Sequence, residues 1–533
     1  MPSLRWRRNA ASGENVHMSA EPVEGVIPRA ADVVIVGAGA AGAAIAARMS
    51  EAGLEDILLV EAGPDYRSAD TPPAVRGTDI SRVLALSSLR WPRLRARLTE
   101  HQPLRGYACG RGVGGGSAIN GQLAVRGGPA DFDAWVKAGC PGWSWPDVLP
   151  TFAAIERDTD FGDRPGHGSF GPIPISRAPA DSSGPVSTAL QAAAAGLGHV
   201  GHPDVNAEGS TGIFPAPWHR QGGARVSSND SYLEPARNRP RLRVVGQHTV
   251  SRVLLAAGRV RGVELVSDGH REVVAAPAVV LCAGAVYSPA ILLRSGVGPP
   301  GQLDALGIEV AADLPGVGAG LSDHPAILLG FRLTEAATAR SRETDSGCFL
   351  LRLRSGPGAG AAADLQMLAL DRTFGPSAGG LLVSLMRPRS AGRLRLRSSD
   401  PADDPVLDLR LLTDRADLGR LRGAVGHAAE LLGQAAFREV IDGRPALPGD
   451  DPDRWRQENC QAQYHPSGTC RMGPPDEAGT VVDEEGRVLG VDGLWVADAS
   501  VIPVPCGVPP YLSTVMVAER LAAAIARRLR AAR

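Results

Sequence analysis

Three glycines and one glutamate near the N-terminus have the spacing of a nucleotide-binding site. Gly37, Gly39 and Gly42 fit the pattern G-x-G-x-x-G, and Glu61 follows 19 positions after Gly42. In such a turn the first glycine permits a sharp bend, the second lets the backbone approach a pyrophosphate, and the third allows close helix packing. A carboxylate at the position of Glu61 can accept hydrogen bonds from both ribose hydroxyls. The expected chemistry is the binding of a dinucleotide.

This site needs a strand before the glycines and a helix after them. Residues 31–36 form a β-branched run typical of a strand buried on both faces. Residues 43–50 have helical composition, and residues 57–60 form a second short strand. The helix would direct its free N–H groups and its positive dipole end at the phosphates. A chance glycine turn is the alternative, but the order of all these features favours binding. The motif alone does not distinguish NAD from FAD.

A second glycine-rich segment, residues 110–121, reads GRGVGGGSAING. It has too many glycines for a regular element, so we expect a loop whose backbone N–H groups can approach a planar ring or a phosphate. A flexible linker is the alternative. Ala118, Ile119 and Asn120 interrupt the low complexity, which favours a binding role.

Four ordered segments resemble the glucose–methanol–choline (GMC) oxidoreductases, a family of FAD enzymes. They are residues 110–135, residues 279–299 with VVLCAGAVYSP, residues 465–473 with HPSGTCRMG, and residues 493–520 with GLWVADAS. The resemblance extends from about residue 31 to residue 528 and is nearest to the choline dehydrogenase-like and furfural oxidase-like branches. It implies an enzyme that removes a hydride from the carbon of a primary or secondary alcohol and transfers it to flavin N5.

The glycine motif and the resemblance together imply a set of cofactor-binding residues. These are Gly37, Gly39, Ala40, Ala41, Gly42, Glu61, Ala62, Arg111, Gly115, Gly116, Ser117, Asn120, Gly121, Val250, Ala283, Gly284, Asp498, Ala499 and Thr514. Some relatives tether FAD through a histidine just before the asparagine of the glycine-rich loop. That position is Ile119 here, so we expect FAD to be bound non-covalently.

The resemblance also implies the catalytic residues. His465 falls where the family keeps its active-site histidine, and a histidine suits removal of a hydroxyl proton because its pKa lies near neutral pH. The family places His or Asn three residues before a threonine that matches Thr514, and this position is Tyr511 here. A tyrosine can orient a hydroxyl, but with a pKa near ~10 it is a poor base at neutral pH. A loop role for His465 and a purely wall-forming role for Tyr511 are the alternatives.

Composition excludes several classes of function. A net charge of −1 argues against a nucleic-acid partner. The seven cysteines form no CxxC pair, so no metal site is predicted, and they fit reduced thiols in a cytoplasmic protein. Residues 1–29 have no apolar core of a signal peptide and are expected to be a disordered extension. No segment is long and apolar enough to span a membrane.

The predicted fold class is α/β (α+β overall), with a Rossmann-like FAD domain and a substrate domain built on an antiparallel sheet. The expected FAD domain spans residues 30–330, the substrate domain residues 331–480, and residues 481–533 return to the FAD domain. Residues 345–372 are mostly apolar and should line the substrate pocket, which points to an apolar or aromatic alcohol; a sheet core is the alternative.

Three hypotheses follow. The first is an alcohol oxidase or dehydrogenase, with O2 or another carrier as electron acceptor. The second, motivated by Tyr511, is a non-redox, lyase-type relative that keeps FAD for structure. The third, a plain NAD(P)-dependent dehydrogenase, is disfavoured by the motifs at residues 110–121 and 465–473.

Overall fold

The β-branched run near the N-terminus becomes the central strand of a five-stranded parallel sheet. The strand order is β11 (Leu242–Val245), β2 (Ile57–Val60), β1 (Val33–Val36), β15 (Val279–Leu281) and β27 (Leu494–Val496). Every residue of β1, β2, β15 and β27 is buried, as expected of strands covered on both faces. Segments that are far apart in the chain therefore complete one sheet. This computed structural model describes residues 27–54, 56–207, 211–356, 362–372, 375, 377–448 and 451–531.

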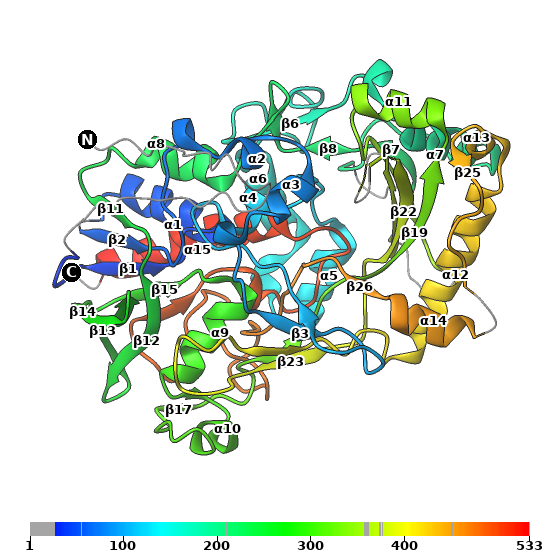
Figure 1. The fold of residues 1–533 in the computed structure, drawn as a ribbon. Coiled ribbons are helices and arrows are strands. Elements are labelled where there is room, and N and C mark those ends of the chain that lie inside the picture. Colours follow the sequence, from blue (N-terminus) through cyan, green and yellow to red (C-terminus); the bar gives the residue numbers. More distant parts are fainter. Residues whose placement is uncertain are drawn as a thin grey trace, which may run out of the picture.

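Helices follow two neighbouring strands of this sheet directly. α1 (Ala40–Glu51) comes after β1, and α9 (Gly284–Arg294) comes after β15. Because β1 and β15 run parallel, both helices begin at the same edge of the sheet. The C-terminal helix α15 (Tyr511–Ala531) packs against α1, and Figure 1 shows the two side by side in the left lobe. Three helix N-termini are thus available around one site.

The first glycine turn has the geometry that its sequence predicts. Gly37 has φ +97°, and a Cβ atom there would lie 2.7 Å from the carbonyl oxygen of Cys282. A Cβ atom on Gly42 would lie 1.8 Å from the carbonyl oxygen of Gly37. Both positions therefore require glycine.

The second glycine-rich segment differs from the expected irregular loop, because it contains the short helix α4 (Gly115–Ile119). Gly112, Gly114 and Gly115 have positive φ angles of 124°, 83° and 47°. Gly112 and Gly114 make the turns that lead into α4, and Gly115 is its first residue. The remaining α4 residues are compatible with a single helical turn.

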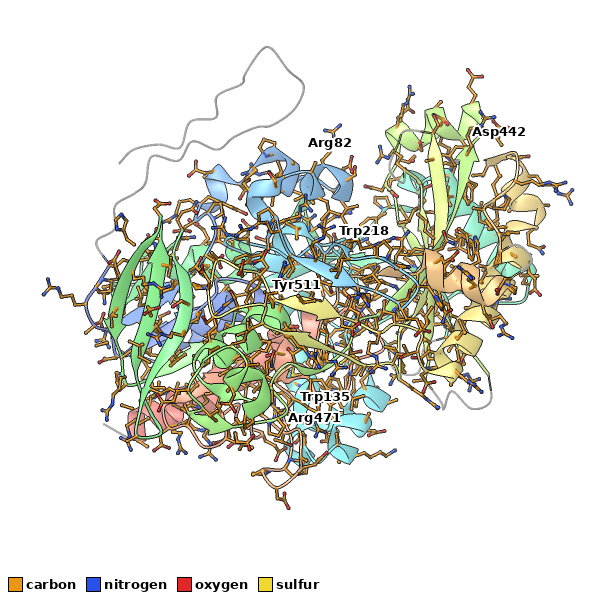
Figure 2. All side chains as sticks on the ribbon, turned by 60° about the horizontal axis from the view of Figure 1, so that its bottom comes forward. Arg82, Trp135, Trp218, Asp442, Arg471 and Tyr511 are labelled. Atoms are coloured by element: carbon orange, nitrogen blue, oxygen red, sulfur yellow. The ribbon has the colours of Figure 1, made fainter. Side chains whose placement is uncertain are left out.

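An antiparallel sheet of seven strands forms the second lobe, at the right of Figure 1. Its strands are β25 (Ile441–Asp442), β19 (Pro325–Leu333), β22 (Ala378–Leu385), β21 (Leu365–Leu370), β20 (Phe349–Leu353) and β7 (Gly212–Pro215), with β26 (Gln461–Ala462) also paired to β19. Helix α12 (Arg415–Leu432) packs on β22. Strand β7 and the start of β19 precede residue 331, so this sheet recruits segments that the sequence prediction placed in the first domain. Figure 2 shows Asp442 at the outer part of this lobe and Trp218 between the lobes.

Further sheets complete the fold. A three-stranded antiparallel sheet contains β12 (Thr249–Ala256), β13 (Arg259–Ser267) and β14 (His270–Ala275). A mixed sheet contains β18 (Ala319–Leu321), β23 (Gly392–Arg395), β24 (Val406–Asp408), β3 (Arg95–Arg97) and β4 (Arg105–Gly106). The other longer helices are α5 (Pro129–Lys137), α6 (Trp145–Ile155), α7 (Pro185–Gly196), α11 (Glu335–Glu343) and α14 (Pro452–Asn459). A parallel nucleotide-type sheet plus an antiparallel second sheet confirms the predicted fold class.

The predicted N-terminal extension, residues 1–29, falls mainly outside the described residues. Of its last three positions, Ile27 packs against the hydrophobic core, and the carbonyl oxygen of Arg29 accepts a hydrogen bond from the Ala275 amide at 2.9 Å. Residues 27 and 29 therefore contact the folded domain, although the prediction placed them in the extension.

Candidate active site

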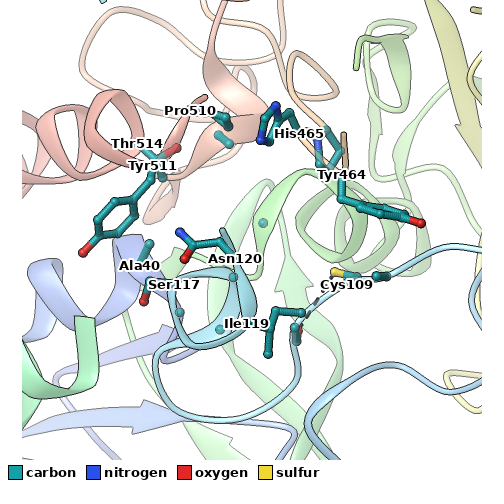
Figure 3. A pocket seen from close by; sticks show the side chains of 18 of the residues that line it. Ala40, Cys109, Ser117, Ile119, Asn120, Tyr464, His465, Pro510, Tyr511 and Thr514 are labelled. Carbon is teal, nitrogen blue, oxygen red and sulfur yellow. Dashed lines mark hydrogen bonds between the residues drawn. The ribbon is translucent and has the colours of Figure 1, made fainter. Parts of the chain in front are cut away.

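One continuous cavity of about 540 Å³ runs from the glycine turn after β1 to His465 and the antiparallel sheet. The structure brings almost all predicted site residues to its wall. Those that line it are Gly37, Gly39, Ala40, Ala41, Glu61, Ala62, Gly115, Gly116, Ser117, Asn120, Gly121, Val250, Ala283, Gly284, His465, Asp498, Ala499, Tyr511 and Thr514. Figure 3 shows His465, Asn120, Tyr511 and Thr514 around this space.

Two predicted cofactor residues, Gly42 and Arg111, do not line the cavity. Gly42 sits behind the first turn, where its missing side chain lets α1 approach Gly37. The guanidinium of Arg111 donates to the Ala62 carbonyl at 2.7 Å and lies over the ring of Trp91. Both residues therefore support the wall from outside instead of lining it.

The two glycine-rich turns meet each other at the cavity. A Cβ atom on Gly115 would lie 2.7 Å from the Cα atom of Gly39, and one on Gly39 would lie 3.8 Å from the Cα atom of Gly115. The approach therefore requires a residue without a side chain at Gly115, whereas a Cβ atom on Gly39 would make an ordinary contact. The result is a narrow cradle of backbone at the N-terminus of α1, which suits a pyrophosphate.

Three backbone amides fix the carboxylate of Glu61. Its Oε2 accepts from Ala38 N at 2.8 Å, and its Oε1 accepts from Gly63 N and Gly112 N, each at 2.8 Å. Glu61 joins the first glycine turn to the second while it lines the cavity. An ionised carboxylate has about four acceptor positions, so one remains for a ribose hydroxyl.

Asp498 holds together the segments around α9. Its Oδ2 accepts from Gly284 N at 2.8 Å and from Ser288 Oγ at 2.6 Å, and its Oδ1 accepts from Ser500 N and Oγ at 2.8 and 2.6 Å. Burial raises the pKa of this carboxyl. Because the side chain is fully used by the protein, a contact of Asp498 with a cofactor would come from its backbone.

Asn120 is oriented by a buried arginine. Arg225 Nη1 donates to Asn120 Oδ1 at 2.7 Å and to the Asn120 carbonyl at 2.8 Å. A guanidinium can only donate, so the atom it contacts must be the amide oxygen, and the NH2 group of Asn120 points towards the cavity. Burial, followed by the charge of Arg220, lowers the pKa of Arg225 to about 9. A cation thus lies directly behind this part of the wall.

His219 also contacts Asn120. Its Nε2 lies 3.1 Å from Asn120 Oδ1, and its Nδ1 lies 2.8 Å from the carbonyl oxygen of Val226. Burial and the charge of Arg225 lower the pKa of His219 to about 3. The imidazole is therefore neutral at pH 7 and can donate to only one of these two oxygens.

Tyr511 was predicted as the second polar group beside His465, and the structure gives its hydroxyl another partner. Tyr511 Oη lies 3.2 Å from Ser228 Oγ, and its ring centroid lies 4.6 Å from that of His219. Figure 3 shows the tyrosine ring pointing away from His465, towards Ala40 and Ser117. Burial raises the pKa of Tyr511 to about 12, so it is not a base at neutral pH. A role for Tyr511 in catalysis stays a prediction.

The partner of His465 is a second histidine, His324. The two Nδ1 atoms lie 2.9 Å apart, and His324 Nε2 lies 3.1 Å from the carbonyl oxygen of Cys506. Burial and the proximity of His324 lower the pKa of His465 well below its ordinary value. Burial also lowers the pKa of His324 to about 4. Both imidazoles are therefore neutral at pH 7.

Asp323 fixes the backbone of both histidines. Its Oδ1 accepts from His324 N at 2.7 Å and from His465 N at 2.9 Å, and its Oδ2 accepts from Tyr107 Oη at 2.5 Å. Burial raises the pKa of Asp323 to about 6, although these hydrogen bonds oppose the rise. This carboxylate joins β18–β19 to the segment that carries His465.

Sequence reasoning missed these supporting residues. His324 and Asp323 stand just before β19, in a Ser-Asp-His-Pro segment whose paired acid and histidine were a usable signal. Arg225 and His219 lie in a stretch without a recognisable motif. Their positions depend on contacts across about a hundred residues, which no local pattern contains.

The predicted substrate lining is corrected in part. Among the apolar residues of 345–372, Leu368 and Leu370 line the cavity, whereas Phe349, Leu350, Leu351, Leu365 and Met367 are buried in the sheet. Leu368 pairs with Leu382, and Leu382 pairs with Leu328, so one row of leucines crosses three strands. Side chains alternate along a strand, and only one face of this sheet meets the cavity.

The fold and this site define a dinucleotide-dependent oxidoreductase. Residues 31–326 match the N-terminal part, and residues 388–518 the C-terminal part, of the GMC oxidoreductase family. The chain belongs to this family, as its motifs predicted, and it is therefore a flavin-dependent enzyme that oxidises alcohols with FAD as cofactor. The cradle at Gly39 and Gly115, which a side chain on Gly115 would fill, fits that cofactor.

Known proteins agree with this assignment. The chain is 36% identical to a 5-(hydroxymethyl)furfural oxidase of Methylovorus sp., over 93% of this chain and 98% of the other. It is 32% identical to an oxygen-dependent choline dehydrogenase of Brucella anthropi, over 89% and 91%. The crystal structure of pyridoxine 4-oxidase from Mesorbium loti superposes with a TM-score of 0.84 at 30% identity, covering 92% of this chain and 98% of the other. Among the described residues, no helix is long and apolar enough to cross a membrane.

Proposed function

We propose that this protein oxidises a primary or secondary alcohol of apolar or aromatic character, with His465 as the general base. The observation that carries the proposal is the contact between His465 and His324 at the wall of the cavity. FAD, when bound, supplies the acceptor for the hydride that leaves the alcohol carbon.

The backbone carbonyl of Cys506 supports a particular tautomer for both histidines. Next to that oxygen, His324 Nε2 carries a hydrogen and donates. A neutral His324 then has a lone pair on Nδ1, which accepts the Nδ1–H of His465. This leaves the lone pair of His465 on Nε2, ready to take a hydroxyl proton. The reverse arrangement would place two acceptors, His324 Nε2 and the Cys506 carbonyl, against each other.

The substrate side of the cavity supports an apolar alcohol. The leucine row formed by Leu328, Leu382 and Leu368 continues to Leu370, and Trp218 lines the same space. These surfaces exclude water from the hydroxyl and from His465, which strengthens the hydrogen bond between them.

We infer non-covalent binding of FAD from the side chain at the tethering position of the family. Ile119 is buried in α4 and lines the cavity, and its hydrocarbon side chain has no nucleophilic atom. The non-redox alternative rested on Tyr511 as the partner of His465. Because His324 contacts His465 instead, no observation favours it.

The test is anaerobic mixing of the purified yellow protein with a series of benzylic and aliphatic primary alcohols. We expect bleaching of the flavin absorbance by wild type and strong slowing in His465→Ala with FAD content unchanged. Bleaching at the wild-type rate in His465→Ala would disprove the assigned base. Comparing peroxide release with dye reduction then identifies the electron acceptor.

A further inference from the structure

Arg220 brings a positive charge to the substrate side of the cavity. It begins the short strand β9 (Arg220–Gln221), and its side chain lines the cavity although only 8% of it is exposed. Much of the wall on this side is apolar, although Arg372 and Ser346 also line the cavity. The apolar residues include Ala326, Leu328, Leu368, Leu370, Leu382 and Trp218. Burying a charged guanidinium in such a wall costs free energy, so we expect it to serve a function or to be fully compensated by partners.

Two neutral contacts hold the guanidinium in place. It lies over the ring of Trp218, 3.7 Å from the centroid, and its Nε donates to Gln122 Oε1 at 2.8 Å. Stacking fixes the plane of the group, and the Gln122 contact uses its inner edge. The outer edge, formed by Nη1 and Nη2, is the part that a ligand could meet.

Arg220 is only partly neutralised by its acidic neighbour, Asp345. Asp345 Oδ1 lies 3.6 Å from Arg220 Nη1, beyond a normal hydrogen bond, and the Asp345 side chain is 37% exposed. A partly hydrated carboxylate at this distance compensates the cation only in part. Burial lowers the pKa of Arg220 to about 10, so the group remains charged at neutral pH.

We propose that Arg220 determines specificity by selecting alcohols that carry a carboxylate on an apolar or aromatic body. The proposal rests on the oxidation of an alcohol at His465. A carboxylate matches the planar fork of a guanidinium and can form two parallel hydrogen bonds with its outer edge. The leucine row and Trp218 would pack against the hydrocarbon body between the two polar ends.

The test compares two substrates of nearly equal shape, 4-(hydroxymethyl)benzoate and the neutral 4-(hydroxymethyl)benzamide. We expect wild type to favour the acid in kcat/KM. Arg220→Met should lower kcat/KM for the acid by about 10- to 100-fold, the usual effect of losing a hydrogen bond to a charged group, and change the amide by less than about 3-fold.

Asp345→Asn should change the preference for the acid in the opposite direction. Removing the competing carboxylate frees the outer edge of Arg220, so KM for the acid should fall while KM for the amide stays constant. A purely structural Arg220–Asp345 pair predicts no gain. Arg520→Met is the matched control, because Arg520 also lies over a tryptophan, 5.0 Å from the centroid of Trp143, but outside the cavity wall. It should leave the ratio of acid to amide unchanged.

Binding of benzoate separates this proposal from the proposed function. Benzoate perturbs the flavin spectrum only if it binds near the flavin, and this needs no turnover. Weaker benzoate binding in Arg220→Met than in wild type supports the carboxylate site even if neither alcohol is oxidised. Equal losses for acid and amide in Arg220→Met, or equal benzoate binding in both proteins, would overturn it.

Discussion

The Nδ1 atoms of His324 and His465 lie 2.9 Å apart, and the opposite nitrogen of His324 lies 3.1 Å from the backbone oxygen of Cys506. The two rings meet nearly at right angles, with an interplanar angle of 79°. A backbone carbonyl cannot change its role as acceptor, so it determines the hydrogen positions on both rings. The loop before α15 is thereby coupled to the proposed base.

Replacing His324 tests this coupling. In His324→Ala, His465 loses the acceptor of its Nδ1–H and can adopt the other tautomer, so we expect flavin reduction to slow by about 10- to 100-fold. His465→Ala should lose more, about 10²- to 10⁴-fold, because it removes the proton acceptor itself. Rapid mixing without oxygen measures both rates. Unchanged reduction in His324→Ala, with normal FAD content, would contradict the assigned role.

The pH profile of kcat/KM follows from the lowered pKa of His465. Only the neutral imidazole can accept a proton, so activity falls on the acid side as His465 becomes protonated. Because burial and His324 lower this pKa, the acid limb should lie below the ordinary histidine value of about 6.5. The unfolded chain binds this proton at higher pH than the folded chain, so the His465 contribution to the free energy of unfolding also decreases as pH falls below about 6.5.

Asp323 titrates in a neighbouring range, since burial raises its pKa to about 6. Asp323→Asn removes this second group and can keep the acceptor for both histidine amides. An acid limb that persists in Asp323→Asn belongs to His465. An acid limb that lies above about 6.5 in wild type would show that burial does not lower the pKa of the base.

The sequence predicted those features that depend on local chemistry. The turn at Gly37–Gly42 and the position of Glu61 could be predicted because both depend on residues close in the chain. In the structure, Glu61 accepts a hydrogen bond from Ala38 within this turn. The orientation of Asn120 does not, because it depends on Arg225, more than a hundred positions later. His465 was recognisable from its motif, but its contact with His324 spans two segments 141 positions apart.

Side chains alternate between the two faces of a strand, and this explains why part of the pocket prediction was wrong. An apolar run such as residues 349–351 is buried on both sides of a sheet, and composition cannot say which face meets a cavity. The register of neighbouring strands decides which face meets the cavity. This register aligns Leu328, Leu382 and Leu368 on one face. The orientation of Tyr511 was also beyond a sequence-based prediction. Tyr511 is the first residue of α15, and the direction of that helix decides where its side chain points.

Tyr511→Phe tests the remaining catalytic assignment. The hydroxyl contacts Ser228 Oγ and has a pKa raised to about 12, so we expect its loss to lower kcat by less than about 10-fold. Steady-state kinetics with one alcohol measures this, and Ser228→Ala is the matched control for loss of the same hydrogen bond. A fall comparable to that of His465→Ala would instead place Tyr511 in the proton transfer.

Gly115→Ala tests the cradle between the two glycine turns. The new Cβ atom would lie 2.7 Å from the Cα atom of Gly39, and Gly115 has φ +47°. The turns must separate, so we expect purification with reduced FAD content and a lower Tm that added FAD partly restores. Gly53→Ala is the matched control, because Gly53 also has a positive φ of 75°, a Cβ atom there meets nothing within 4 Å, and it does not line the cavity. Full FAD occupancy in Gly115→Ala would disprove the tight cradle.

Arg225→Met tests the charge behind Asn120. Among the described residues, the guanidinium of Arg225 donates only to neutral oxygens, including the carbonyl of Val75 at 2.9 Å and that of Ser117 at 3.2 Å. Its buried Nη2 has no hydrogen-bond partner among them. A cation with so little compensation stabilises negative charge that develops in the cavity. We expect its removal to lower the reduction potential of bound FAD. A tenfold shift in the reduction equilibrium corresponds to about 30 mV for two electrons.

The control must separate charge from packing. Arg225→Lys retains the charge without the forked geometry and should recover part of the potential. Arg352→Met removes another buried arginine, whose Nη2 donates to the Gly507 carbonyl at 3.1 Å but which does not line the cavity. If Arg225→Met and Arg352→Met leave the potential equally unchanged, Arg225 only supports Asn120. If Arg225→Met lowers the potential, Arg352→Met does not, and Arg225→Lys restores part of it, the charge of Arg225 acts on the flavin. Lost packing alone would not be repaired by lysine.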